Sequence, residues 1–217
     1  MTDLTTKLKK KRYPYFAIGA VAVGYVMIGI SMLLSPWFSW TSNALSDLGN
    51  TSIQRNVSSG AAFIFDAGLI ISGILTLLFI IFHLTDARFH WKYLVWGVPL
   101  AISAIDLSLI GVFNESFGSI HLLVSVIFFF TTALTLFLYG YVSFPLGAPI
   151  LGAIAIILGI FCATMWVARF PWSGVAIQET TTSATSAIFL LLIARRVIKW
   201  PECVTETGRG KVDQVAR

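Results

Sequence analysis

The sequence predicts an all-α fold, an integral membrane bundle of six transmembrane helices with both termini in the cytoplasm. Of the 217 residues, 57% are hydrophobic and only 12% are charged, whereas a soluble domain has about 25% charged residues. The apolar residues also occur in six long blocks, and a bilayer core of about 30 Å needs about 20 apolar residues per helix. Little chain remains outside the blocks, so we expect one membrane domain and no separate soluble domain.

The blocks place the helices at about residues 14–35, 58–83, 93–113, 118–141, 147–168 and 175–198. The first block is about as long as a membrane span and ends in SPWFSW rather than in a small-residue cleavage site. We therefore interpret it as a retained helix and not as a signal peptide. The transmembrane domain covers 14–198, between a basic cytoplasmic arm at 1–13 and a polar cytoplasmic tail at 199–217.

The basic residues predict the orientation of the bundle. Of the 15 lysines and arginines, all but Arg55 and Arg169 lie in the N-terminal arm, in the link after the second block or near the C-terminus. The positive-inside rule makes this side cytoplasmic, and an even number of spans is then required. The composition thus predicts a multi-pass protein of the plasma membrane. Cys162 lies in the fifth block and Cys203 in the tail, so we expect no disulfide.

The segment 36–57 is the only long link on the outer side. Trp37 and Trp40 are typical interface anchors. Ser42 can cap a short helix that runs to Leu48, with Gly49 as its stop. The outer segments PWFSWTSNALSD and PWSGVAIQE both run from Pro-Trp to an acid, although the match is too short to establish a repeat.

The acidic residues of the membrane region all fall in its outer half. Asp66 and Asp106 lie seven or eight residues from the outer ends of their helices, which is about 10–12 Å deep at 1.5 Å per residue. Glu115 and Glu179 fall near outer helix ends, Asp47 lies in the long loop, and His121 enters the fourth helix from the same side.

An ionisable side chain in hydrocarbon is costly, so these groups should face the bundle interior and have partners. Two carboxylates close together require a shared proton or a cation between them. The clustering therefore predicts an outward-facing acidic pocket, in which Mg²⁺, Ca²⁺ or Mn²⁺ is a possible divalent cation; no cofactor is established. The candidate catalytic residues are His121, Glu115 and Asp47, and the candidate ligand-binding residues are Asn43, Asp66, Asp106, Arg169 and Glu179.

A purely structural interpretation remains open at each position. Asp66 and Asp106 can be protonated or hydrogen-bonded to hydroxyl groups, and the TTTSATS stretch of the last helix is typical of interhelical hydrogen bonding. His83 and His90 lie beside the cytoplasmic interface, where we interpret them as interfacial side chains. No HExxH, Walker or GxSxG motif is present.

Three segments carry a family resemblance: PWFSWTSNALSDLGN, AFIFDAGLIISGIL and GVFNESFGSIH. Over about residues 14–198 the chain resembles a prokaryotic family of six-helix membrane proteins called domain of unknown function 998. On that resemblance the functional residues are those from Ser42 to Gly49, with Glu115, His121 and Glu179. The family implies no activity.

Three classes of function stay open, and whether the protein is an enzyme is uncertain. In the first, the pocket binds or acts on an outer-leaflet lipid or small ligand, with His121 as general acid or base. In the second, the protein is a non-catalytic scaffold or accessory membrane protein. In the third, it is a proton- or cation-coupled transporter, against which we count the lack of an ionisable residue in the inner half of any helix. The expected partners are membrane lipids and not nucleic acid, and the oligomeric state is open.

Overall fold

The computed structural model describes residues 11–50, 58–201 and 204, and all regular structure in these ranges is helical. The six long helices are α1 (Pro14–Leu33), α2 (Ser59–Asp86), α3 (Trp91–Val112), α4 (Ser119–Val142), α5 (Pro149–Val167) and α6 (Ala176–Lys199). Two short 3₁₀ helices, η1 (Leu45–Gly49) and η3 (Glu115–Phe117), lie in the links. All six long helices are long and apolar enough to cross a membrane, which confirms the predicted fold. Their ends lie within three residues of the predicted ones.

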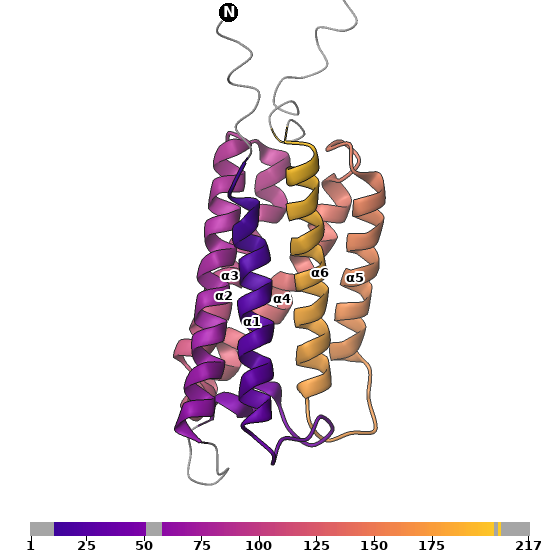
Figure 1. Ribbon diagram of the computed structural model, residues 1–217. Helices are drawn as coiled ribbons and strands as arrows, with labels where there is room; N and C mark the ends of the chain where they lie inside the picture. The colour runs from indigo at the N-terminus through magenta and orange to yellow at the C-terminus, as the bar shows by residue number, and fades with distance from the viewer. Residues whose placement is uncertain (1–10, 51–57, 202–203, 205–217) are drawn as a thin grey trace, which may run out of the picture.

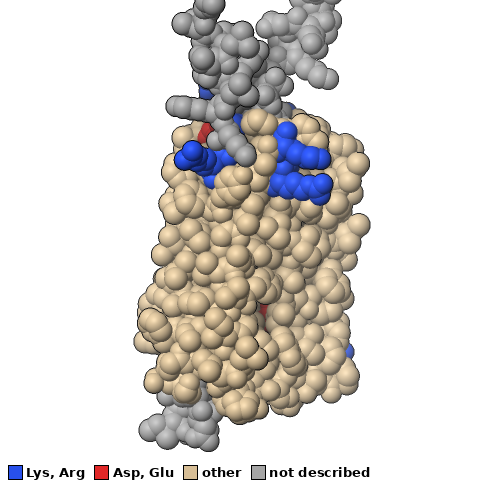
Figure 2. Space-filling model, viewed as in Figure 1, with Lys and Arg blue, Asp and Glu red and all other residues tan. Residues whose placement is uncertain are grey.

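The six helices form a closed ring. Each helix packs against the next along the chain, and α6 packs back against α1 (Figure 1). Helix α1 begins and α6 ends at the same end of the ring. Figure 2 shows lysine and arginine side chains gathered at this end, which we call the basic end; the opposite end, covered by η1, is the η1 end. That the basic end faces the cytoplasm stays a prediction.

Small residues let neighbouring helices approach closely. A Cβ at Gly73 of α2 would collide with the backbone of α3 at Ala104 and Ser108. Gly111 of α3 packs in the same way on the carbonyl of Asp66. In contrast, nothing lies within 4 Å of the Cβ position at Gly29. Close approach through small residues is the usual basis of helix packing in membranes, where lipid tails compete for apolar contacts.

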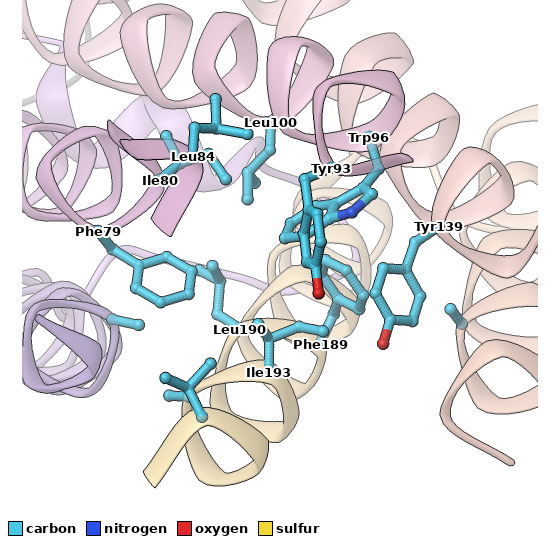
Figure 3. Close-up of a cluster of buried hydrophobic side chains, with 14 of the residues drawn as sticks. Phe79, Ile80, Leu84, Tyr93, Trp96, Leu100, Tyr139, Phe189, Leu190 and Ile193 are labelled. Atoms are coloured by element: carbon cyan, nitrogen blue, oxygen red, sulfur yellow. The ribbon is translucent and has the colours of Figure 1, made fainter. Parts of the chain in front are cut away.

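The core of the ring has two parts. At the basic end, large aromatic side chains from α2, α3, α4 and α6 fill the interior, among them Phe79, Trp96, Tyr139 and Phe189 (Figure 3). At the η1 end a smaller cluster forms where Leu45 and Leu48 of η1 pack on α2, α3 and α4. Many large apolar side chains around the outside of the ring are exposed, as expected for surfaces that contact lipid.

Candidate functional site

The segment before η1 joins the start of α6. The first N–H groups of a helix have no partner within that helix. Here the carbonyl of Asn43 accepts hydrogen bonds from Val175 N (3.1 Å) and Ala176 N (3.0 Å). The carbonyl of Thr41 accepts two more from the preceding residues of the same link. The two outer segments that both begin with Pro-Trp therefore lie against each other.

The carboxylates of Asp47 and Glu179 hold η1 in place. Asp47, which is 1% exposed, accepts hydrogen bonds from Asn43 Nδ2 (2.8 Å) and Ala44 N (3.1 Å). Glu179, in the first turn of α6, accepts from Leu45 N (2.5 Å). An acid in the first turn of a helix also interacts favourably with the helix dipole. Asp47 thus caps the start of η1, and Glu179 fixes η1 against α6.

A second polar group lies at the other end of η1. The carboxylate of Asp66 on α2 accepts a hydrogen bond from Asn114 Nδ2 (2.9 Å), just before η3. Ser116 Oγ donates to Asn50 Oδ1 (3.2 Å). Gly49 lies so close to Asp66 that a Cβ would collide with the carboxylate. The end of η1 is therefore held between α2 and η3.

Glu115 and His121 lie at the turn between α3 and α4. Glu115 is the first residue of η3 and is half-buried. His121 is 7% exposed, and its Nδ1 lies 2.8 Å from the carbonyl of Phe113. Because a carbonyl oxygen only accepts, Nδ1 carries the proton and Nε2 can accept from Ser125 Oγ at 3.4 Å. Both ring nitrogens of His121 thus have partners, one just after α3 and one on α4.

Asp106 and Arg169 lie apart from these two groups. Asp106 is 5% exposed on α3, and its Oδ2 has no hydrogen-bond partner among the described residues. Its burial agrees with the expectation that it faces the protein interior. Arg169 is exposed in the link between α5 and α6 and makes no ion pair with any described acid. Arg55, the other basic residue that the sequence places on the outer side, lies outside the described residues.

The structure therefore places the predicted site residues at one end of the bundle in separate hydrogen-bonded groups, with Asp106 deeper in the ring. None of the eight candidates lines the cavity at mid-depth in the ring or the smaller cavity at the basic end, both of which are described below. Within residues 11–50 and 58–201, no three His, Cys, Asp or Glu side chains come together as a possible metal site. The outward-facing acidic pocket and its divalent cation remain predictions.

A cavity that the sequence reasoning missed lies at mid-depth in the ring. This central cavity is bounded by α1, α2, α3, α4 and α6, and the centre of a water-sized molecule has about 80 Å³ to move in there. Its lining is mostly apolar, with hydroxyl groups from six residues: Tyr25, Ser72, Thr76, Ser103, Ser183 and Ser186. The glycines and serines at matching depth were visible in the sequence, but a packed interface and a cavity share that pattern.

The interpretation of His83 as an interfacial side chain is wrong. His83 is 2% exposed and packs among Phe79, Tyr93 and Trp96 inside the basic end of the ring. A position near the end of a helix does not reveal whether the side chain faces lipid or the ring interior. An ionisable residue therefore does lie in the half of the bundle predicted to be inner, and the argument against transport loses its basis.

Fold and site together define a multi-pass membrane protein in which a short helix, anchored by acids, covers one end of a six-helix ring. The chain matches a family model described as "Protein of unknown function (DUF998)" over residues 18–196, and it belongs to that family. This confirms the resemblance found in the sequence. No curated protein and no solved structure matches the chain.

Proposed function

We propose that the protein binds the apolar chain of a membrane lipid in the central cavity. The lipid comes from the leaflet at the η1 end, which the predicted orientation makes the outer leaflet of the plasma membrane. The observation that carries this proposal is a mostly apolar cavity within the membrane span that reaches the lipid-facing surface of the ring. The following features of its mouth, depth and walls support it.

The mouth of the cavity lies between α1 and α6. Tyr25 of α1 lines the cavity and is 40% exposed, and Ser183 of α6 is partly exposed beside it. The two hydroxyl groups are joined by a 3.1 Å hydrogen bond across the gap between the helices. A lipid chain can therefore enter sideways from the bilayer.

The depth of the cavity suits a lipid tail rather than a headgroup. Ser183 is seven residues into α6, which corresponds to a depth of about 10 Å below its first residue at 1.5 Å per residue. Other lining residues, such as Thr76 and Leu100, lie near the middle of their helices. At these levels the surrounding bilayer consists of acyl chains.

Four of the six hydroxyl groups in the walls, those of Tyr25, Ser72, Ser103 and Ser183, are engaged with the protein. Ser72 Oγ donates to the carbonyl of Ala20 (2.9 Å), and Ser103 Oγ lies 2.8 Å from Thr132 Oγ1. A mostly apolar wall in which most hydroxyl groups already have partners favours an apolar occupant, because a polar one would lose its hydrogen bonds with water on entry.

In this proposal the acids at the η1 end hold the cover and do not bind the ligand. Leu45 and Leu48 close the end of the ring above the cavity, and Asp47 and Glu179 fix the segment that carries them. Entry from the aqueous side is thereby blocked, which leaves the gap between α1 and α6 as the route.

The test uses the full-length protein in vesicles that contain a phospholipid with a diazirine group near the end of one acyl chain. Illumination should crosslink the probe mainly to peptides from α1 and α6 around Tyr25 and Ser183. Replacing Ser186, which lines the cavity, by Phe should strongly reduce that crosslinking because the ring fills the cavity. Ile188→Phe is the matched control, since Ile188 is 45% exposed on the same helix outside the lining.

Crosslinks spread evenly over all six helices, or equal labelling of the Ser186→Phe and Ile188→Phe proteins, would refute the proposal. The leaflet is tested separately by single cysteines in a background without Cys162 and Cys203. A cysteine at the exposed Ser119 should react with an impermeant reagent added to intact cells, and one at the exposed Arg88 should not. The opposite labelling would mean that the lipid comes from the inner leaflet, and it would not affect the proposal that the cavity binds a lipid chain.

A further inference from the structure

A chain of hydrogen bonds leads from the surface of the basic end to His83. Lys11 Nζ lies 2.6 Å from Asp86 Oδ2, and the hydroxyl of Tyr13 donates to the same oxygen at 2.9 Å. His83 Nδ1 lies 3.2 Å from the Tyr13 hydroxyl oxygen. Lys11 also donates to the carbonyl of Pro201, so these hydrogen bonds join segments close to both termini.

This series of hydrogen bonds determines which nitrogen of His83 carries the proton. Tyr13 has one hydroxyl hydrogen, and the carboxylate of Asp86 can only accept it. The contact between His83 and Tyr13 is then a hydrogen bond only if His83 Nδ1 donates to the tyrosine oxygen. In the neutral ring Nε2 consequently carries a lone pair and is an acceptor.

A small cavity lies inside the ring beside His83 and Trp96. Both residues line it, together with Tyr93, Tyr139 and Arg196. His83 is 2% and Trp96 is 1% exposed, and neither nitrogen has a hydrogen-bond partner among the described residues. Figure 3 shows Trp96, Tyr93 and Tyr139 converging on this part of the core. His83 Nε2 is a hydrogen-bond acceptor, and Trp96 Nε1 is a donor.

The size and polarity of the cavity fit one water molecule. The space open to the centre of a water is about 10 Å³, and a buried water needs about 10–15 Å³ and two to four polar partners. A water there can accept from Trp96 Nε1–H and donate to His83 Nε2, which satisfies both orphaned atoms. Leaving such atoms unpaired in a buried site would be costly.

We propose that His83 and Trp96 bind a buried water molecule, and that the Asp86–Tyr13–His83 chain relays protons between this water and the basic end. An excess proton on the water passes to His83 Nε2, the Nδ1 proton passes to the Tyr13 oxygen, and the Tyr13 proton passes to Asp86. One proton moves in total, and histidine and tyrosine end neutral. This site is independent of the lipid proposal, because the two use different cavities.

The charged and titratable groups around His83 come from several elements. Asp86 lies on the same helix and Lys11 on the N-terminal segment, while Arg196 of α6 lines the cavity. Tyr13, Tyr93 and Tyr139 supply the neighbouring hydroxyl groups. Arg196 also donates to the carbonyl of Leu146 (2.7 Å), so part of its guanidinium group is already engaged.

The test is solid-state NMR of the full-length protein in lipid bilayers, with ¹⁵N-labelled histidine. The chain has only three histidines, and the signals that disappear in His83→Gln identify His83. Near neutral pH, we expect His83 as the Nδ1–H tautomer, with magnetisation transfer from water protons to Nε2. The Nδ1 proton should exchange with solvent, and Tyr13→Phe should slow that exchange and shift the tautomer toward Nε2–H.

The Trp96→Phe variant tests the water molecule separately from the Tyr13 contact. It removes the donor to the water but not the Tyr13 contact, so the Nδ1–H tautomer should persist while the water-to-Nε2 transfer is lost. His121, also expected as Nδ1–H, reports whether each variant is folded. An Nε2–H tautomer of His83 in the unsubstituted protein, or no transfer from water to Nε2, would overturn the proposal. Unchanged Nδ1 exchange in folded Tyr13→Phe would overturn the relay.

Discussion

The two ends of the bundle use acidic side chains in different ways. At the η1 end, carboxylates accept hydrogen bonds from backbone N–H groups: Asp47 from Ala44 in its own segment, and Glu179 from Leu45, which is far away in the sequence. At the basic end, Asp86 is paired with the side chains of Lys11 and Tyr13. Backbone amides have no alternative partner inside the protein, whereas a lysine near the surface can turn to water.

This difference separates two roles that look alike in the sequence. The acids at the η1 end had the features of a ligand site: charge in the membrane, clustering and one-sidedness. The structure assigns much of their hydrogen-bonding capacity to holding η1 over the end of the ring. The cavities instead lie at mid-depth and at the basic end, where the sequence raised no expectation.

The largest effect that tests this difference between the two ends is expected when Glu179 is replaced by Leu. The amide of the buried Leu45 then loses its acceptor, and an unsatisfied buried donor costs about 2–3 kcal/mol. Glu179→Gln keeps an acceptor oxygen and should cost about 1 kcal/mol or less. Thermal unfolding in detergent measures both. A Leu variant as stable as the Gln variant would mean that η1 is not held through this carboxylate.

A smaller effect is expected at Asp66, on the other side of η1. Asp66→Leu loses the hydrogen bond from Asn114 and should destabilise by about 1–2 kcal/mol. Asp66→Asn can still accept from Asn114 and should be tolerated better. Unfolding curves in the same detergent give the order of the three proteins. If Leu were tolerated as well as Asn, this contact would have no part in fixing η1.

The smallest effect is expected at the basic end. Asp86→Asn weakens the pair with Lys11, whose side chain is 17% exposed while that of Asp86 is 22% exposed. Ion pairs that water can reach contribute about 0–1 kcal/mol, so the unfolding temperature should hardly move, and added salt should reduce the difference further. A loss as large as that of Glu179→Leu would remove the distinction between the two ends.

The sequence predicted the helices well because their signal is local. Six apolar blocks of the length of a bilayer can hardly form anything else, and every end lay within three residues. The short outer helix was also expected, although its cap is Ala44 and not Ser42, and it includes Gly49, the predicted stop.

The inward or outward direction of single side chains was harder to predict. The apolar blocks are hydrophobic all round, because both lipid and the ring interior accept apolar groups, so periodicity hardly distinguishes the two faces. His83 was therefore placed at the interface although it is buried. The partners of Glu179 and Asp66 depend on contacts between η1 and distant helices, which no local pattern encodes.

The closed ring has one junction of a special kind. Neighbouring helices from α1 to α6 are joined in pairs by the links of the chain, but α6 meets α1 without any covalent connection. Moving α1 away from α6 therefore stretches no link between these two helices, whereas every other pair of neighbouring helices is joined by a link at one end. The mouth of the central cavity lies at this junction, where the Tyr25–Ser183 hydrogen bond crosses the gap. The order in which the chain passes through the membrane thus leaves a lateral opening between α1 and α6, and the Tyr25–Ser183 hydrogen bond holds it closed.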